Sequence, residues 1–309
     1  MENKPIDTLD VCVNKALDFF AKEGDYDLDL PPSAHTLVVG SQNGWLAGRV
    51  LYRFAGRAFS HAAEALAQDE IDTKTALLED VTIVSATGGR NVVPIARYAM
   101  KKGLRVNAIV CNPESQVSKE LKGKRGYTEI YVPAIEEPPT INTATYGRMI
   151  QGVTHESIRR IRRIVDGLVK HEGFYERFEQ FTILLPDHMS EVAFMADWKM
   201  NEVFGRQRGS RTMYWTNAMH GGTVRDGRSE AYIGMGVRNR YFGAEDRRQH
   251  IPLPKDFGPL GYLLVAYSVI GRIQRVKKDR GFQENILKYK AGTKGWDWAS
   301  PIRSRRVAP

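Results

Sequence analysis

Polar residues that could bind an anion follow three short apolar runs in the first half of the chain. The three segments are Gly40-Ser41-Gln42-Asn43-Gly44, Ser85-Ala86-Thr87-Gly88-Gly89-Arg90-Asn91 and Cys111-Asn112-Pro113-Glu114-Ser115. Each precedes an expected helix, and the N–H groups at a helix N-terminus bind phosphate together with Ser and Thr hydroxyls. Such residues also favour ordinary helix caps, but three loops of this kind favour an oxyanion site. The residues predicted to hold the anion are Ser41, Gln42, Ser85, Thr87, Asn91 and Arg90.

Two other phosphate-binding motifs are excluded by spacing. Gly40, Gly44 and Gly48 are spaced G-x-x-x-G-x-x-x-G, whereas a dinucleotide fingerprint needs G-x-G-x-x-G and an acidic residue after the second strand. No G-x-x-x-x-G-K-[ST] loop occurs either.

A second set of residues could carry out proton transfer. Glu202 lies in an expected helix over 190–204, and His220 precedes a Gly-Gly pair. A carboxylate and an imidazole can together act as general base and general acid without a metal or cofactor. By type alone, each could equally be a surface or turn residue. His188 follows an expected strand but belongs to no motif, and the histidines show no metal-ligand spacing, so we expect no metal.

The elements that must position these residues alternate along the chain. Apolar runs over 36–40, 80–85, 105–111 and 127–133 predict buried strands, separated by helices expected over 45–67, 92–102 and 114–121. This alternation predicts a parallel sheet. Further helices are expected over 8–23, 142–171 and 260–273, and further strands over 181–185, 212–216 and 232–237.

Composition bounds the class of protein. The chain has 309 residues, of which 42% are hydrophobic and 26% charged, which predicts one large or two ordinary globular domains. No apolar run approaches the roughly 18 residues of a membrane span. The start Met1-Glu2-Asn3-Lys4 does not resemble a signal peptide, and two cysteines exclude a disulfide scaffold. We therefore expect a cytoplasmic protein without membrane contact.

The net charge of +9 has two interpretations, a nucleic-acid partner or a small anionic ligand. The segment 157–164 has Ile158, Ile161 and Ile164 on one helical face and arginines on the other. This pattern is typical of a packed helix with a solvated basic face. No nucleic-acid motif accompanies it, so nucleic-acid binding is disfavoured.

Several of these segments resemble the sugar isomerase (SIS) domain. Ser85-Ala86-Thr87-Gly88 follows a strand and Cys111-Asn112-Pro113 follows the next, while the segment 140–146 resembles the start of the family's next long helix. The chain as a whole resembles double-SIS proteins such as the phosphoglucose/phosphomannose isomerases and the isomerase half of glucosamine-6-phosphate synthase. Thr87 replaces a family Ser, and Gly89-Arg90 stands where Glu-Thr is common.

The resemblance implies a fold and a set of roles. It implies an α/β three-layer sandwich with an N-terminal segment 1–34 and two SIS-like subdomains, 35–172 and 173–309; the second is expected to be reduced because 221–250 is short. Lys199-Met200-Asn201-Glu202 matches the K-x-x-E that presents the proton-transfer Glu, and His220-Gly221 matches the ring-opening His. In the family this His reaches the neighbouring subunit, which implies a homodimer with its site at the interface. Lys288, in Asn285-Ile286-Leu287-Lys288, would steady the enediolate or be one more solvated lysine.

The function predicted from this set is a cofactor-independent isomerase that interconverts aldose and ketose forms of a phosphorylated or otherwise anionic sugar. It requires the oxyanion loops to lie within reach of Glu202. Two alternatives use the same scaffold: a sugar-phosphate deglycase or deaminase, and a non-catalytic regulator that binds a sugar phosphate.

Overall fold

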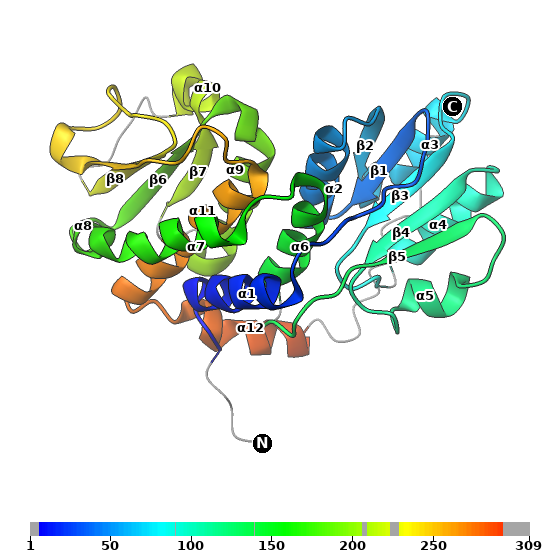
Figure 1. Ribbon diagram of the computed structural model, residues 1–309, viewed down its shortest axis with the longest axis horizontal. Coiled ribbons are helices and arrows are strands. Elements are labelled where there is room, and N and C mark those ends of the chain that lie inside the picture. The colour runs from blue at the N-terminus through cyan, green and yellow to red at the C-terminus, as the bar shows by residue number, and fades with distance from the viewer. Residues whose placement is uncertain (1–5, 90, 139, 206–208, 223–228, 293–309) are drawn as a thin grey trace. The chain divides into compact units, whose positions relative to one another are not determined.

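The computed structural model describes residues 6–89, 91–138, 140–205, 209–222 and 229–292, which form two compact units (Figure 1). The five-stranded unit is built on residues 28–134. The four-stranded unit combines the N-terminal residues through Asp27 with residues 135–290. Among the described residues, no helix has both the length and the apolar sequence that crossing a bilayer requires.

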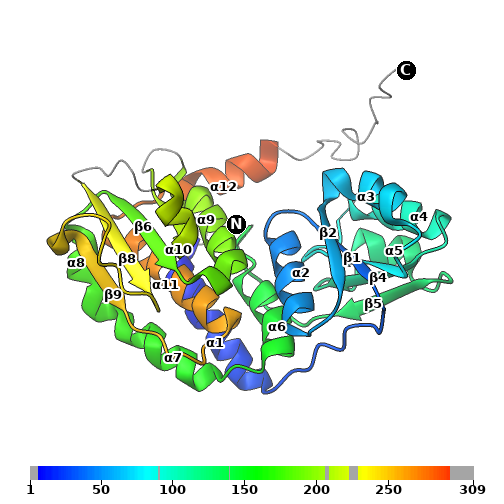
Figure 2. The same cartoon turned by 90° about the horizontal axis from the view of Figure 1, so that it is seen from above.

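The five-stranded unit is a parallel sheet with helices on both faces. Its strands are β1 (Thr36–Gly40), β2 (Phe59–Ala63), β3 (Asp80–Val84), β4 (Arg105–Val110) and β5 (Tyr127–Tyr131), in the order β2-β1-β3-β4-β5. Helix α2 (Asn43–Phe54) covers one face (Figure 2). The opposite face carries α3 (Ala67–Lys74), α4 (Val92–Lys101) and α5 (Gln116–Leu121). The central strands β1 and β3 are buried throughout, as expected for a sheet covered on both sides.

Two glycines allow α2 to pack closely on this sheet. A Cβ atom at Gly40 would lie 2.5 Å from the backbone nitrogen of Trp45, where the chain turns from β1 into α2. A Cβ atom at Gly48 would lie 2.5 Å from Cγ1 of Val38 and 3.0 Å from Cγ2 of Val84. The G-x-x-x-G-x-x-x-G spacing therefore serves a tight turn and close helix–sheet contact.

The four-stranded unit repeats the same strand order in shorter form. Its parallel strands are β6 (Gln180–Leu185), β7 (Arg211–Tyr214), β8 (Glu230–Met235) and β9 (Arg248–Ile251), in the order β7-β6-β8-β9. Helix α11 (Pro259–Val276) is buried along almost its whole length. It packs against α1 (Leu9–Glu23), α6 (Thr143–Thr154), α7 (Ile158–Gly167), α8 (Glu172–Glu176) and α9 (Ser190–Phe204). A short helix α10 (Trp215–Asn217) and a wider turn over Ala218–Gly222 follow β7, and α12 (Gly281–Gly292) follows α11.

The α/β class and the parallel sheets are confirmed, and most of the predicted elements are present. The helix predicted over 45–67 is wrong in its second half, because α2 ends at Phe54, Gly56 takes a positive φ of 64°, and β2 follows as an edge strand. The helix predicted over 142–171 is interrupted at His155, whose φ is 50°. Strand β9 was not predicted.

The second sheet has fewer strands than the first in the part of the chain that the structure describes, as expected for a reduced subdomain. Its β8–β9 connection holds only a 3₁₀ turn over Glu245–Arg247, where a helix would usually cross. The predicted subdomain limits, 35–172 and 173–309, stay a prediction. In the structure α6 and α7 pack with α1 and α11 in the four-stranded unit.

Replacing Gly48 by Ala is expected to lower the free energy of unfolding by about 1–3 kcal/mol, since the added methyl group overlaps Val38. Gly167→Ala is the matched control, because Gly167 has a helical φ of −66° and no atom within 4 Å of its Cβ position. Denaturant unfolding of both variants checks this. Equal stability of Gly48→Ala and the wild type would show that α2 does not need its close contact.

Candidate functional site

The strand order of the five-stranded sheet fixes where a ligand can bind. In the order β2-β1-β3-β4-β5 the connections after β1 and β3 leave in opposite directions, which opens a crevice at their carboxyl ends. Gly40 pairs with Val84 in the β1–β3 register. The next residues, Ser41 and Ser85, are therefore neighbours at this switch point. The structure thus brings together two of the loops that the sequence predicted to bind an anion.

Both loops lead into helices that are not capped by their N-cap side chains. The N–H groups of Gly44 and Val92 donate instead to the backbone carbonyl oxygens of Ser41 and Gly89, at 2.9 and 3.3 Å. Gln42 is the N-cap of α2 with a φ of 47°, and Asn91 is the N-cap of α4; neither side chain accepts a capping hydrogen bond. Helices α2 and α4 have 12 and 10 residues and begin after the carboxyl ends of β1 and β3. The positive end of each helix dipole therefore lies at the crevice. This edge can accept negative charge from a ligand.

The loop after β3 is held in a defined shape. The backbone N–H of Gly88 donates to Oγ of Ser85 at 3.2 Å. Gly88 has a φ of 54°, and a Cβ atom there would lie 2.6 Å from Oγ of Ser115. Ser115 in turn caps α5, because its Oγ accepts the N–H of Ser118. The third polar segment, 111–115, thus supports the second, and Thr87 is exposed at the rim. Arg90 lies outside the described residues.

Glu64, which the sequence analysis missed, lies at the same edge. It directly follows β2, and its carboxyl group is hydrogen-bonded to the side chains of Ser41 and Asn91. Burial raises the pKa of Glu64, and these two hydrogen bonds oppose the rise. Two of the predicted anion ligands therefore already bind an internal carboxyl group. Recognising 59–63 as a strand would have placed Glu64 at a strand end with the others.

The acid–base candidates belong to the four-stranded unit and are described separately. Lys199, on α9, is fully buried, and its Nζ donates to the carbonyl oxygen of Thr140 at 2.7 Å. Nζ also forms an ion pair with Glu202, one turn further along the same helix. The side chain of Glu202 is 20% exposed, so a ligand could reach its carboxylate. The K-x-x-E spacing thus produces a positioned carboxylate with a buried counter-charge.

A second carboxyl group, Glu137, belongs to the same cluster and was also missed. It accepts the backbone N–H groups of Thr143 and Ala144 at 2.9 and 3.0 Å and that of Thr145 at 3.5 Å, at the start of α6. Burial raises the pKa of Glu137 to about 7, whereas these N–H groups and the charge of Lys199 lower it. A carboxyl group close to neutrality in its pKa can act as either acid or base. No sequence motif marks it, because its contacts are with backbone atoms.

Glu202 and His220 do not meet within one four-stranded unit. Helix α9 runs antiparallel to β6 and β7, so Glu202 near its C-terminus lies toward the amino edge of the sheet. His220 follows β7 and α10 at the carboxyl edge, and its side chain is exposed.

Lys288 and His188, also named in the sequence analysis, have no hydrogen bond or ion pair in the described residues with the cluster formed by Lys199, Glu202 and Glu137. Lys288 lies on α12 with an exposed side chain, and the described residues show no hydrogen bond or ion pair to it. His188 packs edge-on against the ring of Tyr262, with centroids 6.3 Å apart. Within the described ranges, no group of three or more His, Cys, Asp or Glu residues could hold a metal ion.

Comparison with known proteins shows which solved structures have a similar fold. No protein-family model matches the sequence, and no curated protein does. The structure is similar to tagatose-6-phosphate ketose/aldose isomerase from Escherichia coli, with a TM-score of 0.56 and 11% identity over 87% of each chain. It is also similar to glucosamine-6-phosphate deaminase from Thermotoga maritima, with a TM-score of 0.57 and 14% identity over 90% of this chain and 95% of that one.

A third similar structure is the C-terminal domain of glucosamine-fructose-6-phosphate aminotransferase from Francisella tularensis. Its TM-score is 0.53 and its identity 12%, over 87% of this chain and 94% of that one. The chain therefore has the fold of SIS-type phosphosugar isomerases, as the sequence predicted.

Replacing Glu137 by Gln is expected to flatten the pH dependence of stability. The folded protein holds the Glu137 proton up to about pH 7, whereas the unfolded chain releases it near 4.5, so this group removes stability as the pH rises between these values. The loss amounts to roughly 2–3 kcal/mol by pH 8. Urea unfolding from pH 4.5 to 8 measures it. Glu136→Gln, at an exposed neighbouring carboxylate, is the control and should follow the wild type. Parallel curves for all three proteins would contradict the raised pKa.

Proposed function

We propose that this protein is an SIS-type isomerase that interconverts aldose and ketose forms of a phosphorylated sugar. The observation that carries the proposal is the pairing of Glu202 with the buried ammonium of Lys199, next to a carboxyl group whose pKa lies near neutrality. The similarity to a tagatose-6-phosphate isomerase supports the substrate class.

The phosphate is bound at the β1–β3 switch point. Ser41, Ser85 and Thr87 donate hydroxyl hydrogen bonds, the side chains of Gln42, Asn91 and Arg90 complete the set, and the starts of α2 and α4 add backbone N–H groups. When the phosphate binds, the carboxyl group of Glu64 must either release its hydrogen bonds to Ser41 and Asn91 or bind the phosphate as a neutral acid. Because burial raises the pKa of Glu64, protonation costs less there than in water, and the acid can donate to a phosphate oxygen.

The isomerisation is a proton transfer between neighbouring carbons. Glu202 takes the proton from C2 of the open-chain aldose, which leaves an enediolate with its charge on O1. The hydroxyl proton then moves from O2 to O1, and Glu202 returns its proton to C1 as the C2 carbonyl forms, which gives the ketose. His220 donates a proton to the ring oxygen as the ring opens, and Lys288 stabilises the charge on the enediolate oxygen. The separation of Glu202 from His220 within one unit favours a homodimer in which His220 comes from the neighbouring subunit.

A deaminase on the same scaffold is the second candidate function. It is favoured by the similarity to glucosamine-6-phosphate deaminase, whose chain is covered almost completely. Deamination also begins with ring opening and proton transfer at C2, so Glu202 and His220 would keep their roles. Release of ammonia from an amino-sugar phosphate separates the two reactions. A regulator that only binds the sugar phosphate would show neither reaction.

Replacing Glu202 by Gln is expected to reduce exchange of the C2 proton with solvent deuterium by at least about 100-fold, since the amide cannot accept the proton. Proton NMR of hexose and pentose phosphates in deuterated water measures the exchange, and calorimetry is expected to show unchanged binding. Glu176→Gln, at an exposed carboxylate on α8, is the control. If the wild type exchanges no sugar phosphate yet binds one, the regulator replaces the enzyme.

The double replacement of Ser85 by Ala and Thr87 by Val is expected to weaken sugar-phosphate binding about 10-fold or more, because two hydroxyl donors to a charged oxygen are lost. Calorimetric titration measures the affinity. Ser229→Ala, at an exposed hydroxyl before β8, is the matched control. Unchanged affinity in the double variant would move the phosphate away from the β1–β3 switch point.

A further inference from the structure

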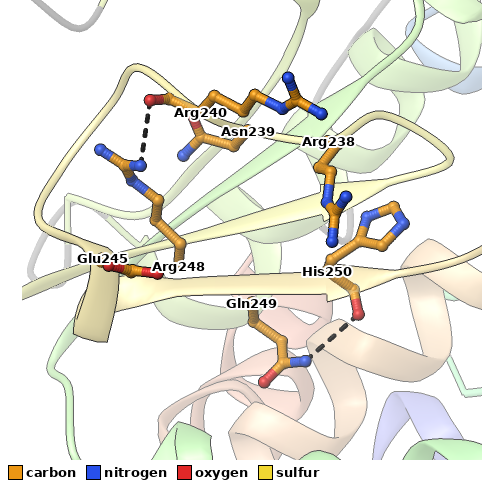
Figure 3. A pocket seen from close by; sticks show the side chains of 7 residues that line it. All are labelled: Arg238, Asn239, Arg240, Glu245, Arg248, Gln249 and His250. Atoms are coloured by element: carbon orange, nitrogen blue, oxygen red, sulfur yellow. Dashed lines mark hydrogen bonds between the residues drawn. The ribbon is translucent and has the colours of Figure 1, made fainter.

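A basic hollow lies beside the β8–β9 connection of the four-stranded unit (Figure 3). Its volume is about 450 Å³, within the range of small-molecule sites. The charged side chains that line it are Arg238, Arg240, Arg248 and Glu245, and the imidazole of His250 lies beside them. We call it the β8–β9 pocket.

The loop that forms this pocket is firmly braced. Arg248 donates from Nε to the carbonyl oxygens of Phe242 and Gly243 at 3.0 Å, and from Nη1 to that of Arg240 at 3.0 Å. Asn239 accepts the backbone N–H groups of Tyr241 and Phe242. Such bonds fix the backbone on both sides of Arg240 before any ligand arrives, which lowers the entropy cost of binding.

Two glycines let the loop lie directly on the sheet. A Cβ atom at Gly234, in β8, would be 2.3 Å from the carbonyl oxygen of Val237. Gly243 has a φ of 70° and lies against the ring of Tyr232. The same carbonyl of Val237 is 3.1 Å from Nδ1 of His250, which ties β9 to the loop. The loop thus replaces the usual crossover helix and leaves its basic side chains open to solvent.

The cationic groups of the pocket are not neutralised by the loop's own acids. The guanidinium groups of Arg238 and Arg240 have no ion pair in the described part of the chain. Asp246 faces away from the pocket to Arg177, with 3.6 Å between the charged atoms. Glu245 is the acidic residue at the rim, so the arginines exceed the acidic groups there. In Figure 3 the side chain of Arg238 extends toward the ring of His250.

We propose that the β8–β9 pocket binds the phosphoryl group of a small phosphorylated molecule, at a site on a different unit from the β1–β3 switch point. Arginine forks match phosphate oxygens in pairs, and the braced loop presents two of them beside an imidazole. The pocket follows β8, which borders the β6–β8 switch point of the second sheet, the counterpart of β1–β3 in the first. This site does not depend on the proposed isomerase activity.

Calorimetric titration with inorganic pyrophosphate tests the proposal, in a chain that also carries Ser85→Ala and Thr87→Val so that the other unit contributes least. Saturable binding is expected, and adding Arg238→Gln with Arg240→Gln is expected to weaken it at least 10-fold. The matched control adds Arg159→Gln with Arg163→Gln, which removes two exposed arginines from α7. This control should leave the affinity unchanged.

Three outcomes would overturn the proposal: no binding of pyrophosphate, equal losses in both double arginine variants, or no loss in either. A fourth is salt-dependent binding of duplex DNA that requires Arg238 and Arg240 while pyrophosphate fails to bind, which would make the surface a nucleic-acid contact. Since Arg238 and Arg240 are exposed, circular dichroism and thermal unfolding should show a folded variant. The titration measures binding of pyrophosphate and no reaction. Its result can therefore be interpreted even if the isomerase test fails.

Discussion

A fully buried ammonium group, that of Lys199, constrains the centre of the four-stranded unit. Removing such a charge from water costs several kcal/mol unless partners replace the lost hydration. The carbonyl oxygen of Thr140 and the carboxylate of Glu202 are those partners, and the ring of Tyr267 lies 5.9 Å from Nζ. Glu202 is held on its helix by this pair, so the same contact that stabilises the core also orients the partly exposed carboxylate.

The start of α6 is shaped by the same cluster. Thr140 and Asn142 both have positive φ values, 69° and 45°, which residues with side chains seldom adopt. The reversal turns the Thr140 carbonyl to Lys199 and leaves the first N–H groups of α6 to Glu137. Backbone strain of this kind persists only where surrounding contacts compensate for it, and here those contacts are with ionisable groups. The hydrogen bonds and the ion pair that hold the start of α6 are therefore made by the same side chains that could carry out acid–base chemistry.

Much of the fold could be predicted from the sequence, because buried parallel strands leave long apolar runs and α9 has the bounds expected of it. Strands β2 and β9 were not predicted, because they are edge strands that are half exposed. Their segments, Phe59–Ala63 and Arg248–Ile251, mix polar with apolar residues and show no continuous apolar run. Ser41, Ser85 and Glu202 could be chosen by type and motif. Glu64 and Glu137 could not, since their importance comes from strand order and from backbone N–H groups that only the folded chain brings to them.

The two sheets have matching strand orders, yet their crossovers differ. In the first, β3, β4 and β5 are linked through the helices α4 and α5; in the second, β8 reaches β9 without an α-helix. A parallel sheet tolerates this loss at its border, where the outermost strand β9 is fully buried only at Ile251. Such a border is free to change its surface over time while the central strands keep the architecture, so a duplicated fold can acquire new recognition at one copy's margin without disturbing the other copy.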